Sequence, residues 1–404
     1  MADRKPLRTT SRPSQAKQQR SRNTRSGPVY RATSRRVSGR DEIPPSRYRR
    51  KRRYRFTFRF KIIVAALILI FVFVNVSRLS DYLSKKTDVR LTDEGITHAE
   101  RFYDCAAIHG VDISVHQGES IKWKKVKTSG ANFAFIRAGY RDADDGKLHI
   151  DSMFEENVDK AAQAGIMTGA YIYSQALTPQ EAVEEADFLI DLVDDHEITM
   201  PLVIDYEIYP NGRLDKKIQT GSMYAASFYH DIVQAFCRRV EAAGYESAVY
   251  ANKNMLTNYM QADLLDDTDT IWLAQYGETS DLDADYWFWQ CSDSAKVGGI
   301  SGKVDHDIWY IRPGTVYKTR ASGSEKKRTI SIGDCHVSFQ RSVTKIKRLR
   351  AEPKLGITYE GRGLREGKDY VISVVNNVDP GTGYIIVRGI GKYKDWIMEP
   401  FETE

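Results

Sequence analysis

Short apolar runs alternate with longer amphipathic stretches from Gly110 to about Ile311. Eight of the runs have the length of buried strands. Amphipathic helical patterns separate the early runs, and the last three follow one another with little helix between them. This alternation predicts an α/β barrel that is incomplete on its helical side. The predicted strands are Val111–Ser114, Phe133–Ala138, Thr168–Tyr173, Pro201–Tyr206, Ser247–Ala251, Thr270–Ala274, Tyr286–Gln290 and Val304–Trp309.

One further apolar run has no polar face. Ile62–Val76 contains no charged residue, proline or glycine, and the phenylalanines from Phe56 onward bring it close to the roughly 20 residues of a membrane span. The chain before it is basic, because Met1–Lys61 has a net charge of +18 and the remainder has −12. Basic flanks stay in the cytoplasm. We therefore predict a disordered basic cytoplasmic arm at 1–55, a transmembrane signal-anchor at 56–77 and a stalk at 78–109.

The basic arm has two interpretations. Its few apolar residues predict disorder, and a disordered basic tail binds nucleic acid in some proteins. Its place directly before an apolar run favours the flank of a single membrane span, so we expect contact with membrane lipid and no nucleic-acid partner. This topology puts the N-terminus in the cytoplasm and the body outside the cell. A cleaved signal peptide is the alternative, although residues 74–77 offer no good cleavage site.

Cysteine and histidine spacing argues against metal chemistry. Cys105, Cys237, Cys291 and Cys335 form no CxxC pair, and the eight histidines show no HxxH or HExxH spacing. No Gly-x-Ser-x-Gly elbow is present either. We expect no cofactor and no bound metal. Cys237 lies in an apolar helical run and is predicted to be a buried thiol, while a disulfide such as Cys105–Cys335 stays open.

Polar and aromatic residues gather near the ends of the predicted strands. Barrel enzymes build their sites at the carboxyl ends of the strands. Acids and aromatics at most of the eight ends therefore predict a carbohydrate cleft, although Tyr171, Tyr250 and Trp287 taken singly fit core packing equally well. The residues near the strand ends are Asp112, Arg137, Tyr171, Tyr173, Asp205, Glu207, Tyr250, Asn252, Gln275, Tyr276, Trp289, Gln290 and Asp305.

The sharpest chemical signal is a pair of acids after the apolar run Pro201–Ile204. In a strand, residues two apart point to the same face, so Asp205 and Glu207 would project side by side about 7 Å apart. Glycoside hydrolysis uses paired carboxyl groups, one to protonate the leaving oxygen and one to stabilise or attack the sugar cation. Neighbouring acids also push their pKa values apart, which keeps one of them protonated.

Several motifs occur in a fixed order along the barrel segment. Together they resemble the family 25 glycoside hydrolases, the N-acetylmuramidase type of lysozyme. The resemblance covers roughly half of the chain and sets the predicted hydrolase barrel at 110–311. The motifs are Gly110–Ser114 with Gln117-Gly118, Phe133–Ala138, Gly169–Tyr171, Val203–Glu207, Trp272–Tyr276, Trp289-Gln290 and Val304-Asp305.

The resemblance implies a TIM-like (β/α) barrel with helices around five strands and few around the last three. It also implies cleavage of the β-1,4 bond between N-acetylmuramic acid and N-acetylglucosamine, with peptidoglycan strands as the partner. Glu207 would be the general acid/base and Asp205 would orient the substrate acetamido group or stabilise the cation it forms. Asp112 and Asp305 would complete an acidic floor. The expected substrate-binding residues are Arg137, Tyr171, Tyr173, Tyr250, Asn252, Gln275, Tyr276, Trp289 and Gln290.

Two departures from the family pattern lie near these motifs. The family often has an aromatic residue after Trp-Gln, where this chain has Cys291, and an Asn two residues after the last Asp, where it has Asp307. Neither departure removes a proposed catalytic acid. A non-catalytic, membrane-anchored protein that binds wall glycan is the alternative function.

The stereochemical outcome stays open. Asp205 and Glu207 would approach one side of the sugar, which favours acetamido-assisted retention. Asp112 or Asp305 could instead act as a base on the opposite face, which would give inversion.

The chain after the barrel changes character. Residues 312–328 form a charged linker, and 329–404 shows strand alternation with turn signals and no long helix. Turn residues such as Gly367-Lys368-Asp369 and Pro380–Gly383 separate the short strands. The segment resembles the small immunoglobulin-like β repeats of bacterial surface proteins and predicts an all-β, sandwich-like module. Wall binding, a spacer role and a stabilising cap for the barrel are all compatible with it.

Overall fold

The computed structural model describes Leu67 and residues 90–404, apart from 119, 221–225, 263–264, 266–269, 319–328, 342 and 348–349. The chain divides into two units, Met1–Ile68 and Leu69–Glu404, and all described residues except Leu67 belong to the second. The predicted arm, the predicted span apart from Leu67, and residues 78–89 of the predicted stalk lie outside the described residues. No helix within the described part of the chain is long and apolar enough to cross a membrane.

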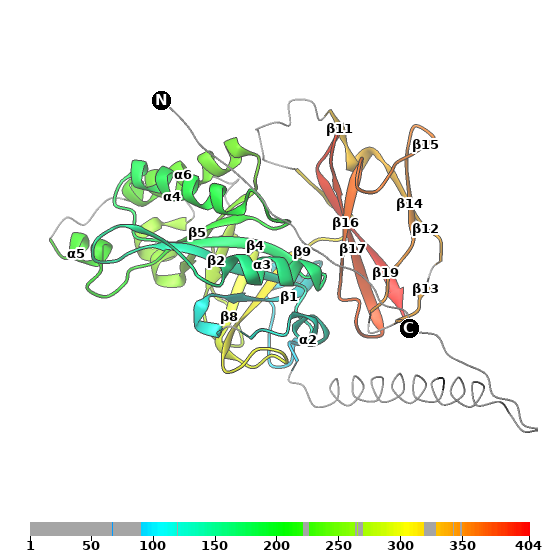
Figure 1. Cartoon of the computed structure of the whole chain (residues 1–404), viewed down its shortest axis with the longest axis horizontal. Helices are drawn as coiled ribbons and strands as arrows, with labels where there is room; N and C mark the ends of the chain where they lie inside the picture. The colour runs from blue at the N-terminus through cyan, green and yellow to red at the C-terminus, as the bar shows by residue number, and fades with distance from the viewer. Residues whose placement is uncertain are drawn as a thin grey trace, which may run out of the picture. The chain divides into compact units, whose positions relative to one another are not determined.

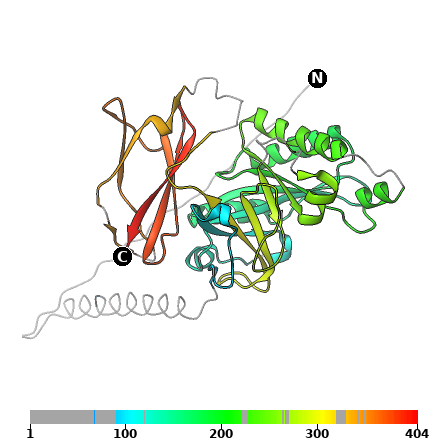
Figure 2. The same ribbon diagram turned by 180° about the vertical axis from the view of Figure 1, so that it is seen from behind.

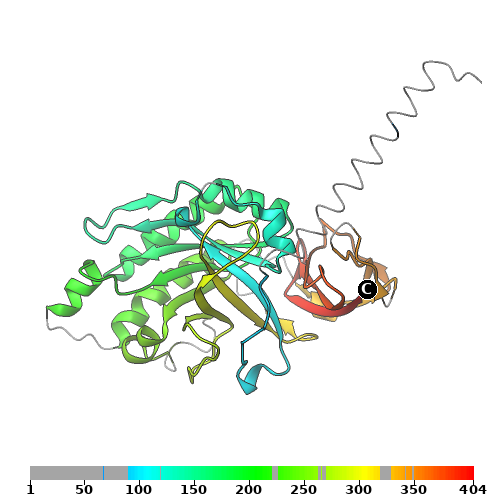
Figure 3. The ribbon, with the colours of Figure 1, turned by 90° about the horizontal axis from the view of Figure 1, so that it is seen from below.

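Eight strands close into a barrel in the second unit (Figures 1 and 3). Their order is β1-β9-β8-β7-β6-β5-β4-β2, and a pairing between β1 and β2 closes the ring. A short β3 forms a hairpin with β2. The bounds are β1 Ala106–Ile113, β2 Phe133–Arg141, β3 Leu148–Ile150, β4 Met167–Ser174, β5 Leu202–Tyr206, β6 Ser247–Asn252, β7 Ile271–Ala274, β8 Phe288–Ala295 and β9 Val304–Ile311.

The last strand of the barrel runs against the others. Neighbouring strands from β1 through β8 are parallel, whereas β9 is antiparallel to both β8 and β1. The connection from β8 to β9 is a short turn rather than a crossover, which permits this reversal. As a result, the first residues of β9 lie at the same rim as the carboxyl ends of its neighbours.

Helices follow the early strands and not the late ones, as the sequence predicts. No regular helix of the fully described segments 275–287 and 296–303 separates β7 from β8 or β8 from β9. The closed barrel with its helices confirms the α/β barrel prediction. The helices are α2 Trp123–Thr128, α3 Phe154–Gln163, α4 Pro179–Val193, α5 Arg213–Gln219, α6 Ala226–Ala243 and the π-helical turn η3 Met255–Met260.

Alternation along each strand separates two hydrophobic clusters. Inside the barrel, Phe135, Trp272 and Phe288 pack together, with Phe135 stacked on Trp272 at 4.4 Å between ring centroids. Between the barrel and its helices, residues of the other parity, such as Ile136 and Leu273, pack against α3, α4 and α6. A residue's parity on its strand therefore decides whether it can reach the interior of the barrel.

The segment before β1 belongs to the barrel unit. Leu91 and Phe102 are buried, and Phe102 stacks on Tyr310 of β9 with ring centroids 3.9 Å apart. The backbone N–H of Leu91 donates to the carbonyl of Ser129 at 2.9 Å. Residues 90–105, which the sequence places in a stalk, thus pack on the barrel, and β1 begins at Ala106. Phe102 packs on the outer face of β9, and Leu91 lies against Gly130 after α2.

The C-terminal region is all β (Figures 1 and 2). Its largest sheet has the order β10-β19-β17-β16, with β13 paired to β19. Ile332, Ile357, Ile385, Val387 and Ile397 form its own buried cluster. The strands are β10 Val316–Tyr317, β11 Ile330–Ser331, β12 His336–Phe339, β13 Val343–Thr344, β14 Leu355–Tyr359, β15 Arg362–Gly363, β16 Tyr370–Val375, β17 Gly381–Gly389, β18 Tyr393–Lys394 and β19 Trp396–Thr403.

This module joins the barrel through side chains as well as through the linker. Trp396 packs against Trp309 with ring centroids 5.8 Å apart, and Arg388 donates to the backbone carbonyl of Thr199 at 2.7 Å. Strand β10, inside the predicted linker, pairs with β19. The four cysteines are free, with Cys237 buried as predicted.

Candidate active site

Carboxylic acids occupy interior positions at one rim of the barrel. Lower interior positions on the same strands carry apolar residues such as Ile108 and Val203. The register brings β5 next to β6 with Asp205 opposite Tyr250, and β9 between β8 and β1 with Asp307 opposite both Gln290 and Gly110. We call the five acids gathered here the acidic rim. Its members are Asp112, Asp205, Glu207, Asp305 and Asp307.

Strand β5 supplies the pair that the sequence singles out. Asp205 is 7% exposed, and its Oδ1 meets no donor among the described residues. Glu207 follows the strand and accepts a hydrogen bond from Asn252 Nδ2 at 3.4 Å. The backbone carbonyl of Glu207 also accepts from Gln175 Nε2 at 3.0 Å. The loop after β5 is therefore tied down at its first residue, while both carboxyl groups keep oxygens free of ion pairs.

A chain of hydrogen bonds orients the acid on β1. The Tyr250 hydroxyl donates to Gln290 Oε1 at 3.0 Å, and Gln290 Nε2 donates to Asp112 Oδ2 at 2.7 Å. All three side chains are at least nine-tenths buried. Gln290 on β8 therefore fixes the orientation of the Asp112 carboxyl group, and Tyr250 on β6 fixes the orientation of Gln290. The sequence suggests only that Tyr250 and Gln290 contact the substrate.

Strand β9 contributes two acids rather than one. Asp305 lies at its start, which is part of the same rim because β9 runs antiparallel to its neighbours. Asp307 is fully buried and accepts from Trp272 Nε1 at 3.0 Å. In the sequence, Asp307 stands out only as a departure from the family pattern. Its parity with Asp305 was the signal that it also faces the interior.

The environment favours the protonated form of these acids. Burial raises the pKa of Asp205, and the charges of Glu207 and Asp112 raise it further. Burial also raises the pKa of Glu207, against the lowering effect of the Asn252 amide. For Asp305, burial and then the charge of Asp293 raise the pKa to about 6. A carboxyl group that keeps its proton near neutral pH can act as a general acid.

Burial raises the pKa of the two innermost acids as well. For Asp112 the charge of Asp305 adds to burial, and for Asp307 the charge of Asp112 adds to burial. One oxygen of Asp307 is buried without a donor among the described residues, which again favours a protonated carboxyl group. The acidic rim therefore cannot hold five full negative charges at once.

Other predicted site residues surround the acids. Tyr171 is buried beneath them and packs edge-on against Trp272 at 6.3 Å. Tyr276 is 56% exposed, so its ring is open to a ligand. Arg137 is held by Asp151 through an Nε–Oδ2 contact of 2.8 Å. Its positive charge still lowers the pKa of Asp205 and Tyr173, against the larger raising effect of burial, so Arg137 lies near both groups.

Two predicted substrate-binding residues face away from the site. Trp289 is fully buried in the cluster outside the barrel, where its Nε1 donates to the backbone carbonyl of Gln275 at 2.8 Å. The Gln275 side chain pairs with Asp281 and Ser280 of the following loop. Each residue has the outward parity of its strand, next to the inward Gln290 and Tyr276.

One group of residues could share a metal ion. In the part of the chain that the structure describes, Asp142, Asp145 and His149 are the residues whose ligand atoms converge. Asp142 and Asp145 lie in the turn between β2 and β3, and His149 lies in β3. Asp142 and Asp145 already accept backbone and lysine hydrogen bonds. The group is separate from the acidic rim and carries no metal assignment.

Comparison with known proteins shows which enzyme family the barrel segment matches. Residues 111–300 match the sequence model described as glycosyl hydrolases family 25. Over these residues the barrel is similar to the glycosyl hydrolases of family 25. The match begins inside β1 and covers β2 to β8, and it includes all the acids of the rim except Asp305 and Asp307. The chain therefore carries an enzyme domain that hydrolyses glycosidic bonds.

Relatives of the family 25 domain are lysozymes by name. The chain is 29% identical over 214 residues to lysozyme M1 of Streptomyces globisporus, covering 50% of this chain and 68% of that protein. It is 28% identical to the autolytic lysozyme of Clostridium acetobutylicum, covering 49% of this chain and 54% of that protein. The chain thus spans about half the length of the second relative.

Solved structures are similar over about half of this chain. A bacterial lysozyme from Streptomyces coelicolor is 24% identical, covering 50% of this chain and 92% of that one, with a TM-score of 0.42. A family 25 glycosyl hydrolase from Bacillus anthracis is 21% identical, covering 53% of this chain and 92% of that one, also with a TM-score of 0.42.

Proposed function

We propose that this protein is a peptidoglycan hydrolase that cleaves the β-1,4 bond between N-acetylmuramic acid and N-acetylglucosamine. The observation that carries the proposal is the acidic rim inside a family 25 domain. The names of its relatives, lysozyme M1 and an autolytic lysozyme, support the same substrate. Five acids with raised pKa values and an exposed tyrosine at the rim suit a glycan substrate better than a charged one.

Within this proposal, Glu207 is the general acid/base. Burial raises its pKa, and Asn252 holds one of its oxygens. Asp205 lies beside it on the same face of β5 and orients the acetamido group of the substrate. Asp112, held by Gln290, stabilises positive charge on the sugar from the opposite strand. Because the acid must be protonated, activity should decline as pH rises through the raised pKa of Glu207.

The test is release of reducing ends from purified peptidoglycan by the full-length chain. Glu207→Gln keeps the shape of the side chain and removes its proton, so we expect activity to fall about 10²- to 10⁴-fold. Glu155→Gln, on the exposed face of α3, is the matched control and should keep full activity. If the wild-type chain binds acetylated and de-acetylated glycan but cuts neither, the protein is a glycan-binding protein instead.

Substrate chemistry also tests the role of Asp205. If the acetamido group takes part in the reaction, glycan without N-acetyl groups should not be cleaved, and the product first formed should retain the β configuration. An α product at the start would show inversion, with Asp112 or Asp305 as the base. NMR of a defined oligomer distinguishes the two anomers.

We also propose that residues 56–77 anchor the protein in the membrane, with the barrel outside the cell. The uncharged run Ile62–Val76 and the +18 charge before it support this topology. Protease added to intact cells stripped of their wall should remove the barrel and leave the arm protected. A mature N-terminus near Ser77 would instead show that the enzyme is cleaved and secreted.

The C-terminal module is assigned a stabilising role in this proposal. We place it among immunoglobulin-like β modules, and its contacts through Trp396 and Arg388 support a stabilising role at the barrel. A chain ending at Arg312 should then unfold at a lower temperature than the full chain. If its melting temperature is unchanged, the module serves only as a spacer or a wall-binding unit.

A further inference from the structure

Two basic segments that lie far apart in the sequence meet beside the module. One is α2 with its lysines, and the other is the described part of residues 341–354, which carries five cations and one acid. Three adjoining cavities of 320, 370 and 630 Å³ lie between and along them, and all three share Arg350 and Glu352 in their walls. We call this row of cavities the basic groove. Its cations are Lys124, Lys127, Arg341, Lys345, Lys347, Arg350 and Lys354.

The negative charges in the groove do not balance these cations. The walls contain two carboxylates, Glu197 and Glu352, against seven cations. Glu352 is engaged by Arg350 at 2.7 Å, and Lys345 pairs with Glu404 at 3.3 Å. The surrounding barrel is acidic, with a net charge of −18 over residues 110–311. The cations are therefore concentrated here although most of the body is negative.

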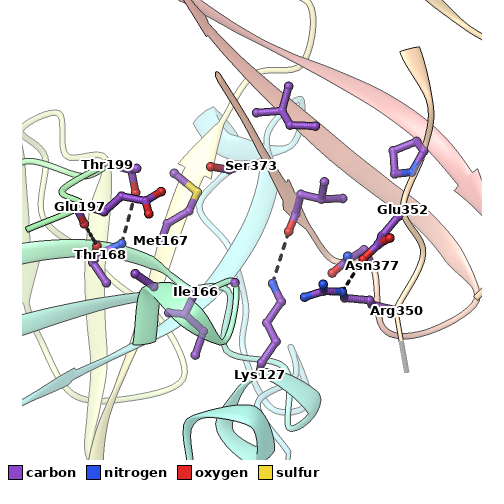
Figure 4. A pocket seen from close by; sticks show the side chains of 15 residues that line it. Lys127, Ile166, Met167, Thr168, Glu197, Thr199, Arg350, Glu352, Ser373 and Asn377 are labelled. Carbon is purple, nitrogen blue, oxygen red and sulfur yellow. Dashed lines mark hydrogen bonds and ion pairs between the residues drawn. The ribbon is translucent and has the colours of Figure 1, made fainter. Parts of the chain in front are cut away.

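One cation of the basic groove, Lys127, is buried inside the protein. Its side chain extends from α2 to the carbonyl of Val374 on β16, close to Arg350 (Figure 4). The Nζ donates to Asn132 Oδ1 at 3.0 Å and to Val374 O at 3.3 Å, both neutral acceptors. Burial and then the charge of Arg350 lower the pKa of Lys127 to about 7. Asn377, in the wall of the same cavity, has a buried Oδ1 without a donor among the described residues.

Like charges brought together in a fold reduce its stability unless a counter-charge offsets them. The carbonyl end of α3 offsets part of the repulsion between the cations, since a helix C-terminus stabilises a nearby cation by about 0.3–1 kcal/mol. That effect covers one side chain such as Arg350, and Lys345 has Glu404 as its partner. Among the described residues, the other five cations of the groove have no carboxylate partner. An external anion is the remaining way to offset the charge.

We propose that the basic groove binds a linear polyanion that bears phosphate groups. Three cavities in a row suit a chain with repeated charges better than a single small anion. Five of the seven cations are lysines, which act as point charges toward phosphate, and the fork of Arg350 is already engaged by Glu352. The acidic barrel repels such a polymer elsewhere, which confines it to the groove. This proposal does not depend on the catalytic activity.

The test is lysine acetylation of the full-length chain, read for each lysine by mass spectrometry, with linear inorganic polyphosphate as the probe. A reading for each lysine is necessary because the N-terminal arm is itself basic. At a polymer concentration about four times Kd, Lys124 and Lys347 should react about fivefold more slowly. Lys368, exposed on the same module, should react as before. Protection should disappear between about 50 and 200 mM salt.

A matched pair of variants separates the groove from general attraction. Lys124→Glu with Lys347→Glu should abolish protection of Lys354, whereas Lys296→Glu with Lys368→Glu, two exposed sites elsewhere, should leave it intact. Unchanged glycan hydrolysis by the first variant confirms that it folds. Equal protection of Lys368, or no protection at all, would overturn the proposal. So would protection by polyglutamate equal to that by polyphosphate, or protection only by phosphatidylglycerol vesicles, which would indicate a membrane surface instead.

Discussion

Like charges converge at two places in this chain, the acidic rim and the basic groove, and the fold relieves the repulsion differently. At the rim, burial and neighbouring acids raise the carboxyl pKa values, so protons neutralise part of the charge. In the groove, only the buried Lys127 has a pKa lowered to about 7 among the described residues. The guanidinium of Arg350 cannot release its proton near neutral pH. Protons that can be given away suit general-acid chemistry, whereas fixed positive charges suit the binding of an anion.

A buried acid with a structural role, Glu185, lies in the same barrel and provides a comparison. Glu185 on α4 is fully buried, as Asp307 of the rim is, but Arg141 Nε donates to its Oε1 at 2.6 Å and Ser174 Oγ donates to its Oε2 at 2.5 Å. Both of its oxygens are therefore satisfied by the fold. Asp205, by contrast, keeps an oxygen without a donor among the described residues. Burial alone does not mark a functional acid, but burial without a partner does.

The largest expected effect is on catalysis at the rim. Asp205→Asn removes the carboxyl group that orients the acetamido group and keeps the side-chain shape, so we expect kcat to fall about 10²- to 10³-fold. The free energy of unfolding should stay the same or rise, because an unpaired buried acid is lost. Asp191→Asn on the outer face of α4 is the control. A variant that loses stability in step with activity would place Asp205 with Glu185 as a structural acid.

A smaller effect is expected on stability. The pKa of Asp305 is raised from an unfolded value near 4 to about 6, so the folded state binds the extra proton and stability falls as pH rises through this window. Asp305→Asn should therefore raise the free energy of unfolding by about 1–3 kcal/mol at pH 7 and leave it unchanged at pH 4. Denaturant unfolding at the two pH values measures this. A gain of equal size at both would attribute the effect to packing rather than to charge.

Much of the site could be predicted because strand parity is a local property. Asp205 and Glu207 share a face since they are two residues apart, and that reasoning needed no structure. The same rule, applied strictly, excludes Trp289 and Gln275, which are each one residue from an interior position. It also includes Asp307, two residues after Asp305. Parity along the strand, more than proximity to a motif, decides which side chains face the interior of the barrel.

Other features depend on pairings that no local pattern encodes. The antiparallel direction of β9 brings the start of that strand, rather than its end, to the rim. The packing of Leu91 and Phe102 on the barrel is set by long-range contacts. The meeting of α2 with residues 341–354 joins parts of the chain more than 200 residues apart. The barrel could be read from periodicity, but the basic groove could not.

The smallest expected effect concerns the stability of the basic groove. If the cations of the basic groove repel one another without a ligand, Lys347→Ser should raise the free energy of unfolding by about 0.2–0.5 kcal/mol at low salt. The gain should vanish near 1 M salt, where the Debye length is about 3 Å. Lys368→Ser, outside the groove, should give no gain at either salt concentration. Adding polyphosphate should reverse the order, so that the wild-type chain becomes more stable than the Lys347→Ser variant, because the bound polymer turns the repulsion into attraction. A gain that persists in high salt would come from local backbone preference, and the groove would then carry no electrostatic strain for a ligand to relieve.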